Sequence, residues 1–436
     1  MTRIVAFFKK NWKESKETKN AIWIIGGRVV QMMLSFFVGI LTARYLGPSN
    51  YGIMNYAAAY VTFFTSFCTL GINSVIIKDF VDHPDEQGEA IGTTLVLRAL
   101  SSFLSSIMII GIVFIIDYDE PITITVTALC SIALVFQVAD TLNYWFQFRY
   151  QSKVSSIATL CSYLVTSIYR IFLLIMQKDV RWFAFASSID YICVAIILFI
   201  AYRNENGPKL SVSIRKAKEL LGKSYNYILA SMMVAIYGQT DKFMLKQMLD
   251  ETSVGYYSLA STIINMWVFV LAAIIDSMYP TIIQYAKIDQ DKFEQKNKQL
   301  YAIVIYVSLI VAIGFMAFGK WIIKILYGDT YLPASMPLKI VCWYTIFSYL
   351  GTARNAWVVS TNNQKYLKYI CGGAAIANVA LNYIFIPIWG ASGAALASLL
   401  TQIATIVVIP YFIKSMRPNV KLMVDAFLLK NITRKC

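Results

Sequence analysis

Long apolar runs dominate this chain, and their length constrains its fold more than any other feature of the sequence. Each run is close to the roughly 20 residues that an α-helix needs to cross the hydrocarbon core of a bilayer. We identify twelve runs, at residues 21–45, 51–77, 91–115, 121–147, 154–175, 182–202, 219–245, 255–285, 300–325, 334–360, 369–387 and 391–413. Only 14% of the residues are charged, against about a quarter in soluble domains. The sequence therefore predicts an all-α polytopic membrane protein.

Lys and Arg residues are distributed unequally between two sets of connections. One set holds 26 of them and comprises residues 1–20, 78–90, 148–153, 203–218, 286–299, 361–368 and 414–436. The other holds 3 and comprises residues 46–50, 116–120, 176–181, 246–254, 326–333 and 388–390. Because basic connections stay on the cytoplasmic side, both termini are predicted to be cytoplasmic, which requires an even number of spans. The formal charge of +15 then reflects topology and lipid headgroups, and no nucleic-acid partner is expected.

A weak internal repeat divides the twelve predicted spans into two halves. Residues 46–57 (LGPSNYGIMNYA) have an echo at 249–260 (LDETSVGYYSLA), with identity only at the first Leu, the Gly and the last Ala. Each copy joins the first two spans of a six-span half, so the halves are predicted to be parallel repeats, an arrangement found in transporters. We predict a cytoplasmic tail at 1–20, an N-lobe at 21–205, a basic cytoplasmic linker at 206–218, a C-lobe at 219–415 and a cytoplasmic tail at 416–436.

The sequence offers little for catalysis or metal binding. The connections predicted to face outward are all short, and the single histidine, His83, lies in a connection predicted to face inward. A His-based triad is therefore excluded. No G-x-x-x-x-G-K-[ST] motif is present, and the seven cysteines are scattered without C-x-x-C spacing. We expect a protein that is not an enzyme and holds no cofactor, structural metal or disulfide.

Ionisable residues inside the predicted spans are the first candidates for function. Each deep arginine costs roughly 2.5–3.5 kcal/mol to insert and needs a wet cavity, a carboxylate partner or an anionic ligand. The deep arginines are Arg28, Arg98, Arg170 and Arg354, and the acidic residues in the spans are Asp140, Asp190, Asp241 and Asp276. Internal Arg–Asp pairs that only hold helices together are the alternative. Lys242 follows Asp241 directly, so the two side chains are expected on different faces of the helix.

Polar side chains also recur at helical spacing within the spans. They form three stripes: Gln137, Asp140, Tyr144 and Gln147; Asn55, Thr62, Ser66, Thr69 and Asn73; and Asn378 with Asn382. Ser and Thr on such stripes often only join helices. Asn, Gln and Asp, together with the deep arginines, predict a basic, water-filled central cavity.

Two segments resemble Wzx-type polysaccharide flippases of the multidrug/oligosaccharidyl-lipid/polysaccharide exporter superfamily. The first is Leu41-Thr42-Ala43-Arg44-Tyr45-Leu46-Gly47-Pro48 with Tyr51-Gly52; the second runs from Asn378 through Asn382 and Pro387 to Gly393-Ala394-Ala395. The resemblance implies two six-helix lobes around a central cavity that opens alternately to each side of the cytoplasmic membrane. It also implies transport of a polyprenyl-pyrophosphate-linked oligosaccharide to the outer leaflet for O-antigen, capsule or exopolysaccharide synthesis, with a polysaccharide polymerase and other assembly proteins as further partners beside membrane lipid.

Residue roles follow from that implication. Arg28 and Arg98 are expected to receive the pyrophosphate, because guanidinium groups bind phosphate oxygens bidentately, and Arg170 and Lys242 are expected to bind it after the cavity reorients. The full predicted substrate-binding set is Arg28, Arg98, Arg170, Lys242, Arg354, Asn55, Asn73, Gln137, Tyr144, Asn378 and Asn382. Proton or sodium coupling is expected at Asp140, Asp190, Asp241 or Asp276, and the choice of ion is left open.

Three alternatives remain at this stage. A multidrug exporter of the same superfamily is disfavoured by the basic cavity. A peptidoglycan-precursor flippase of the superfamily often has spans beyond twelve, and none remain here. A membrane-embedded glycosyl polymerase or ligase belongs to a different class and is disfavoured by the short outward connections and the repeat.

Overall fold

The protein is helical throughout the part that the structure describes. The computed structural model describes residues 16–430, and of these the side chains of 16–25, Arg28, Val29, Ser74, Asn226, Ala230 and Tyr237 lie outside the description. Nine helices in the described residues are long and apolar enough to cross a membrane. Every regular element in residues 16–430 is a helix. The predicted fold class, an all-helical multi-pass membrane protein, is confirmed; the number of twelve spans stays a prediction.

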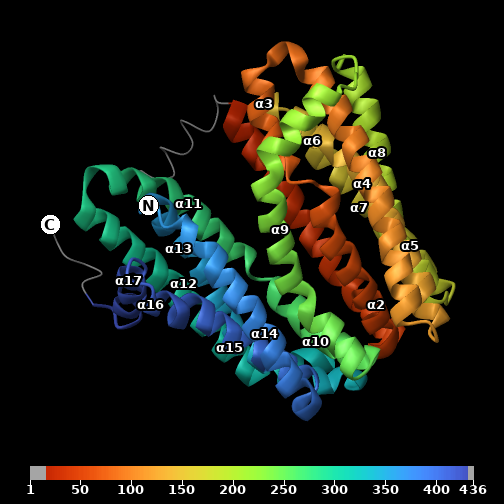
Figure 1. Cartoon of the computed structure of the whole chain (residues 1–436). Helices are drawn as coiled ribbons and strands as arrows, with labels where there is room; N and C mark the ends of the chain where they lie inside the picture. The colour runs from red at the N-terminus through yellow and green to blue at the C-terminus, as the bar shows by residue number, and fades with distance from the viewer. Residues whose placement is uncertain (1–15, 431–436) are drawn as a thin grey trace, which may run out of the picture. The chain divides into compact units, whose positions relative to one another are not determined.

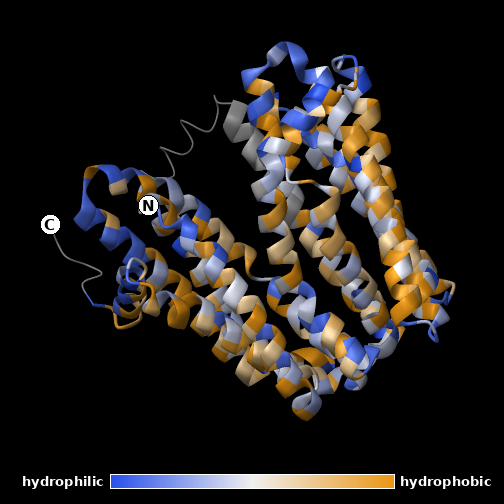
Figure 2. Ribbon diagram, viewed as in Figure 1, coloured by the Kyte–Doolittle hydropathy of each residue, from blue (hydrophilic) through white to orange (hydrophobic). Residues whose placement is uncertain are grey.

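The described chain divides into two compact units. Unit 1 contains residues up to Tyr45 and Ala57–Ala235, and unit 2 contains Leu46–Tyr56 and the chain from Ile236 onward. Helix α2 (Lys16–Cys68) belongs to unit 1 except for Leu46–Tyr56. The other helices of unit 1 (Figure 1) are η1 (Ile72–Ser74), α3 (Ile76–Asp82), η2 (Pro84–Glu86), α4 (Gln87–Ile116), α5 (Pro121–Phe136), η3 (Gln137–Ala139), α6 (Asp140–Phe148), α7 (Ser152–Ile175), α8 (Val180–Asn204) and the first part of α9 (Ile214–Met248). In Figure 2, hydrophobic residues predominate along α4 and α5, and hydrophilic residues lie at the connections.

Unit 2 contains the remaining helices, and its largest apolar core surrounds Phe293, Tyr301 and Trp357. The helices are α10 (Glu251–Asn265), α11 (Phe269–Ile288), α12 (Gln290–Tyr327), η4 (Asp329–Ala334), α13 (Ser335–Ser360), η5 (Gln364–Tyr366), α14 (Leu367–Trp389), α15 (Ala391–Ile403), η6 (Ala404–Val408), α16 (Ile409–Phe412) and α17 (Arg417–Phe427). α17 lies within the segment 416–436, which is predicted only as a cytoplasmic tail.

The helices differ from the predicted spans at three places. The second predicted span, 51–77, ends as an α-helix at Cys68 because Leu70 and Gly71 adopt φ angles of 49° and 57°. A Cβ on Gly71 would lie 2.9 Å from the backbone nitrogen of Ile228, so only glycine permits this close approach of α9. The run 121–147 is interrupted by η3, and the run 255–285 is interrupted between α10 and α11.

Within each unit, hydrogen bonds and ion pairs join connections that belong to the same set, either the basic set or the set poor in Lys and Arg. In unit 1 the Arg149 guanidinium donates to the carbonyl of Glu205 at 3.4 Å, which joins two basic connections. The hydroxyl of Tyr45 donates to the carbonyl of Lys178 at 3.1 Å and joins the end of the first run to a connection of the other set. In unit 2 the Lys298 ammonium lies 3.3 Å from the carboxylate of Asp425. The cytoplasmic placement of the termini stays a prediction.

The two copies of the repeat contact each other reciprocally within unit 2. A Cβ on Gly52 would lie 1.7 Å from the carbonyl oxygen of Glu251, and a Cβ on Gly255 would lie 2.1 Å from the carbonyl oxygen of Pro48. The repeat offset of 203 residues relates Gly52 to Gly255 and Pro48 to Glu251, so each contact is the counterpart of the other. Such a reciprocal pair of contacts is the signature of a local pseudo-twofold axis. The glycine shared by both copies is therefore the residue that lets the two backbones touch.

Candidate functional site

A buried guanidinium forms the polar centre of unit 1. Arg98 on α4 is 3% exposed. Its Nη1 donates to the hydroxyl of Thr141 at 3.0 Å, its Nη2 donates to the carbonyl of Gln137 at 3.4 Å, and its Nε has no hydrogen-bond partner in the described residues. Both acceptors lie where η3 meets α6, so the break in the predicted span provides them. Both acceptors are neutral, so neither forms an ion pair with the arginine.

Other predicted residues surround this centre. Asp140 and Tyr144 on α6 interact electrostatically with Arg98, although Arg98 and Asp140 form no ion pair in the described residues. Asp140 accepts a hydrogen bond from the amide of Asn143 at 3.1 Å, and Asn73 bonds to the hydroxyl of Tyr144. The structure thus brings four predicted residues, Asn73, Gln137, Asp140 and Tyr144, to Arg98.

Asp190 and Arg170 form a second polar group in unit 1. The Ser162 hydroxyl bonds to both the carboxylate and the carbonyl oxygen of Asp190. Arg170 lies near enough to act on Asp190 electrostatically, and its buried Nε has no hydrogen-bond partner in the described residues. Asp190 compensates part of the charge of Arg170. We therefore interpret the Arg170–Asp190 pair, more than the Arg98 centre, as a structural contact.

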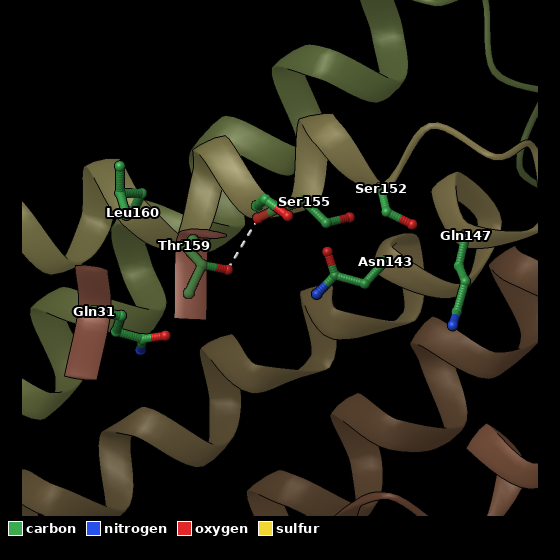
Figure 3. Close-up of a pocket in the computed structure, with 9 residues that line it drawn as sticks. Gln31, Asn143, Gln147, Ser152, Ser155, Thr159 and Leu160 are labelled. Carbon is green, nitrogen blue, oxygen red and sulfur yellow. Dashed lines mark hydrogen bonds between the residues drawn. The ribbon is translucent and has the colours of Figure 1, made fainter. Parts of the chain in front are cut away.

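A polar cavity of about 310 Å³ in unit 1 is lined by Asn143, whose amide donates to Asp140 (Figure 3). Its lining comes from α2, α6 and α7 and contains no charged residue: Gly27, Gln31, Asn143, Gln147, Ser152, Ser155, Ser156, Thr159 and Leu160. Within the lining, the Thr159 hydroxyl donates to the carbonyl of Ser155 at 2.9 Å. The Oδ1 atom of Asn143 and the hydroxyl of Ser155 are buried without a hydrogen-bond partner in the described residues. The cavity therefore offers polar atoms to a neutral, hydroxylated ligand.

A buried carboxylate forms the polar centre of unit 2. Asp241 on α9 is 6% exposed. Its Oδ1 accepts hydrogen bonds from the amides of Asn382 at 2.7 Å and Asn378 at 3.2 Å, both on α14. Its Oδ2 accepts from the hydroxyls of Tyr257 on α10 and Ser398 on α15. All four donors are neutral, and Asp241 forms no ion pair in the described residues. Lys242, expected on a different face of the helix, nevertheless interacts with Asp241 electrostatically.

This carboxylate opens onto a cavity of about 340 Å³. Lys242, Tyr257 and Ser398 also line it, together with Gln239, Ser261 and Asn265. The Oδ1 atom of Asn382, next to Asp241, is buried without a hydrogen-bond partner in the described residues. Of the residues that line the cavity, Gln239 also has an Oε1 atom that is buried without a hydrogen-bond partner in the described residues. The Asp241 carboxylate and this amide oxygen are ligands of the type that a small hard cation requires.

The remaining predicted residues do not join these centres. Arg354 on α13 is 4% exposed, and its Nη1 donates at 3.2 Å to the carbonyl of Thr405 in the π-helical turn η6. Asn55 donates at 2.9 Å to the carbonyl of Tyr51 in its own helix. Asp276 is exposed and forms no bond within the described residues. The side chain of Arg28, on α2, lies outside the described residues.

An ion cluster lies where α3 and η2 meet the start of α9. The Lys216 ammonium, 0% exposed, is 2.8 Å from the carboxylate of Asp79 and 3.1 Å from that of Glu86, and Lys223 is 3.5 Å from Asp79. Although burial acts to lower the pKa of Lys216, its bonds to Asp79 and Glu86 raise it above the ordinary value. Hydrogen bonds from Arg215 and Lys216 lower the pKa of Glu86 to about 2.

The same cluster has the residue types of a metal site. Ligand atoms of Asp79, His83 and Glu219 lie within 4.8 Å of one another. Lys216 and Lys223 already neutralise these carboxylates, and a divalent cation would have to displace both ammonium groups. We therefore interpret the cluster as an ion-pair network that fastens the linker to unit 1.

Comparison with known proteins decides the family. Residues 41–336 match the family described as polysaccharide biosynthesis protein. The chain belongs to this family. A Shigella flexneri protein named "Putative O-antigen transporter" is 21% identical over 402 residues, which cover 87% of this chain and 93% of the relative. The resemblance to Wzx-type polysaccharide flippases is thereby confirmed.

Solved structures show that this member of the polysaccharide biosynthesis family has the fold of the MOP superfamily. An inward-facing multidrug resistance MATE family transporter aligns with a TM-score of 0.72 and 12% identity, over 91% of this chain and 96% of the other. Lipid II flippase MurJ, in an inward closed conformation, aligns with a TM-score of 0.69 and 15% identity, over 95% and 94%. A MOP superfamily transporter from Pyrococcus furiosus aligns with a TM-score of 0.62 and 12% identity, over 94% and 97%. Family and fold together identify a multi-pass membrane transporter and point away from an enzyme.

Sequence reasoning missed several residues of both centres. Tyr257 and Ser398 complete the set of donors around Asp241, and Thr141 binds Arg98. Hydroxyl residues are frequent in apolar spans as helix–helix contacts, so nothing in their spacing distinguished these three. Tyr257 did carry one signal, because it lies inside the second copy of the repeat, two residues after Gly255.

Proposed function

We propose that this transporter moves polyprenyl-pyrophosphate-linked oligosaccharide repeat units from the inner to the outer leaflet of the cytoplasmic membrane, for the synthesis of a surface polysaccharide. The single observation that carries the proposal is the buried Arg98 guanidinium in a member of the polysaccharide biosynthesis family. Arg98 binds only neutral acceptors and retains an unbonded Nε–H. A phosphate oxygen would satisfy that donor and compensate the buried charge.

The uncharged cavity that Asn143 lines supports the glycan part of the proposal. A sugar presents neutral hydroxyl groups, and the unbonded oxygens of Asn143 and Ser155 suit such donors and acceptors. The cationic centre and the uncharged cavity share α6, which carries Asp140 and Tyr144 toward one and Asn143 and Gln147 toward the other. A ligand with a pyrophosphate next to its first sugar would engage both. Arg28, Arg170 and Lys242 are further candidates for the pyrophosphate.

Alternating access of two parallel six-helix lobes around a central cavity is the proposed mechanism, with twelve spans and both termini in the cytoplasm. The reciprocal contacts of Gly52 and Gly255 support the internal duplication on which this mechanism rests. Outward movement of the anionic carrier is assisted by the negative-inside potential, by about 2.3 kcal/mol per uncompensated charge per 100 mV.

Asp241 is the proposed ion-coupling residue among the four acidic candidates. It combines a buried carboxylate that forms no ion pair in the described residues with a polar cavity, whereas Asp276 is exposed. A proton or a sodium ion at Asp241 would change the charge of unit 2 by one, which gives the carrier a way to reset between transport cycles.

Complementation of a flippase-null strain tests the substrate proposal. The variants are Arg98→Ala, Arg98→Lys and the exposed Arg203→Ala as the matched control, all at equal protein levels. We expect Arg203→Ala to restore surface polysaccharide fully and Arg98→Ala to reduce it at least about 10-fold, the effect of losing one charge-assisted hydrogen bond. Arg98→Lys should restore little, since an ammonium cannot bind two phosphate oxygens in the guanidinium geometry. Full rescue by Arg98→Ala would remove this residue from the mechanism.

Reconstituted transport separates this proposal from its rivals. Proteoliposomes loaded with a fluorescent lipid-linked oligosaccharide report flipping, and a cationic dye or lipid II replaces it in parallel samples. Preference for the lipid-linked oligosaccharide supports the proposal. Transport of the dye alone or of lipid II alone would identify a multidrug exporter or a peptidoglycan-precursor flippase instead.

A further inference from the structure

Helix α17 crosses α12 at the point where the apolar run of α12 begins. The amide of Asn419 donates to the hydroxyl of Tyr301 at 2.7 Å, and the hydroxyl of Tyr306 donates to the carbonyl of Phe427 at 2.7 Å. α12 has 38 residues and is therefore about 57 Å long, nearly twice the thickness of the hydrocarbon core. Its first turns must extend beyond that core, so α17 lies at the membrane surface. The adjacent connections belong to the basic, predicted cytoplasmic set.

A wholly apolar groove runs under α17. It has a volume of about 320 Å³ and is lined only by apolar side chains from α12, α13, η6 and α17: Ile305, Leu309, Trp343, Ile346, Phe347, Leu350, Val407, Val420, Met423, Val424 and Phe427. At its mouth, Val424 and Phe427 are 47% and 56% exposed. Exposed apolar side chains at the end of an apolar groove are suited to contact with a hydrocarbon chain.

A basic pocket continues directly from this groove. Val407, Val420 and Val424 line both. The second pocket adds four cations, Lys298, Lys414, Arg417 and Lys421, and two carboxylates, Glu294 and Asp425. Lys298 is paired with Asp425 at 3.3 Å. Lys414 and Lys421 are exposed and form no ion pair in the described residues, and the Nε of Arg417 donates to the carbonyl of Tyr411 at 2.7 Å. Positive charge therefore exceeds negative charge at the polar end of the groove.

We propose that this site binds an anionic glycerophospholipid of the cytoplasmic leaflet. One acyl chain occupies the groove, and the phosphate lies against Lys414, Arg417 and Lys421. The second acyl chain remains in the bilayer beside the exposed side chains of Val424 and Phe427. A free phosphate would leave the groove empty, and a zwitterionic headgroup would bring its own ammonium group to the lysines. Such a lipid would hold α17 against unit 2 and fix it at the membrane surface.

Native mass spectrometry of the full chain in detergent tests the site. The probes are dioleoyl phosphatidylglycerol, dioleoyl phosphatidylcholine and a polyprenyl phosphate, each titrated separately. The charge variant is Lys414→Ala/Lys421→Ala, and its control is Lys365→Ala/Lys368→Ala in another basic connection of unit 2. The groove variant is Val407→Trp, whose bulky ring fills the apolar lining; its control is Val408→Trp, at the neighbouring residue that is 44% exposed.

We expect phosphatidylglycerol to bind more tightly than phosphatidylcholine. The charge variant should bind phosphatidylglycerol about 30-fold more weakly than the unaltered chain, at roughly 1 kcal/mol for each lysine. Val407→Trp should weaken this binding at least about 10-fold, since a few buried methylene groups are lost from contact. Both controls should bind as the unaltered chain does. Equal binding of the two phospholipids, or equal losses in variants and controls, would overturn the proposal. Preferential binding of the polyprenyl phosphate would assign the site to the substrate's carrier instead.

Discussion

Two aspartates of similar burial are held in opposite ways. Asp241 in unit 2 is 6% exposed and Asp79 in unit 1 is 2% exposed. Two lysines neutralise Asp79, with Lys216 at 2.8 Å and Lys223 at 3.5 Å. Asp241 has no lysine or arginine in ion-pair contact within the described residues and instead accepts hydrogen bonds from two hydroxyls and two amides.

The difference separates a structural carboxylate from one available for exchange. A neutralised buried carboxylate contributes to specificity and stability and binds nothing further. Asp241 has no ion-pair partner in the described residues and interacts electrostatically with Lys242, so a cation that reaches its carboxylate can form a direct contact there. Burial alone therefore does not identify a functional acid; the charge of its partners does.

The largest effect is expected from Asp241→Asn. This change keeps the shape of the side chain and removes its charge, so the fold should persist while coupled transport falls at least about 10-fold. Transport into proteoliposomes, measured with and without a sodium or proton gradient, checks this. The control is Asp276→Asn, at an exposed aspartate of the same unit. Unchanged gradient dependence in the Asp241 variant would show that coupling lies elsewhere.

The next largest effect is expected from Lys216→Met, which removes the fully buried partner of Asp79. Breaking a buried ion pair costs about 3 kcal/mol, so the thermal unfolding temperature in detergent should fall by several degrees. Lys218→Met, at an exposed lysine of the same helix, is the control. Adding Asp79→Asn to Lys216→Met should recover part of the loss. Equal stability of Lys216→Met and Lys218→Met would contradict the structural role.

A smaller effect tests the dependence of the Asp241 centre on the repeat contact. Gly255→Ala places a Cβ against the carbonyl of Pro48 and must shift α10, which carries Tyr257 to Asp241. We expect a loss of about 1–3 kcal/mol in stability, the usual cost of overpacking, and weaker ion dependence of transport. Gly52→Ala should act alike from the other copy. Gly111→Ala, where a Cβ meets nothing within 4 Å, should leave both properties unchanged.

The smallest effect concerns the pH dependence of the Asp79 cluster. Bonds from Arg215 and Lys216 lower the pKa of Glu86 from 4.5 to about 2. A lowered folded-state pKa contributes stability that is fully present above pH 4.5 and is lost as the pH falls toward 2. Glu86→Gln should therefore flatten the stability curve across this window. Thermal unfolding between pH 6 and pH 3 measures it, and an identical pH profile in the variant would refute the assignment.

The sequence predicted much of the helical framework and part of each centre. Asp241, Asn378 and Asn382 were selected as polar residues in apolar spans, and they meet at one carboxylate. Asn55 was selected by the same rule and only bonds to its own helix. Selecting polar residues in apolar spans detects the free-energy cost of placing a polar group in a membrane. A hydrogen bond to any acceptor, including a carbonyl of the same helix, offsets that cost.

Local backbone breaks escaped prediction for a related reason. The end of α2 at Cys68, the turn η3 and the helix α17 depend on neighbours far away in the sequence. Gly71 shows this most directly, because the approach of α9 to its Cα requires glycine there, while the surrounding residues remain as apolar as a continuous span. Hydropathy measures transfer from water and is insensitive to which helix lies alongside.

The sequence by itself determined that the chain lies in a membrane, that it is helical and that it contains a repeat. Transfer free energy and the need to satisfy backbone hydrogen bonds in lipid act on each segment separately, so each segment shows them in its own sequence. Only the tertiary structure decided which buried charges are neutralised. Asp79 and Asp241 are each an aspartate in a sequence rich in Lys and Arg, and ion pairing depends on distances of a few ångströms between residues more than a hundred positions apart. Those distances are set by packing, as at Gly52 and Gly255, where the two copies of the repeat meet.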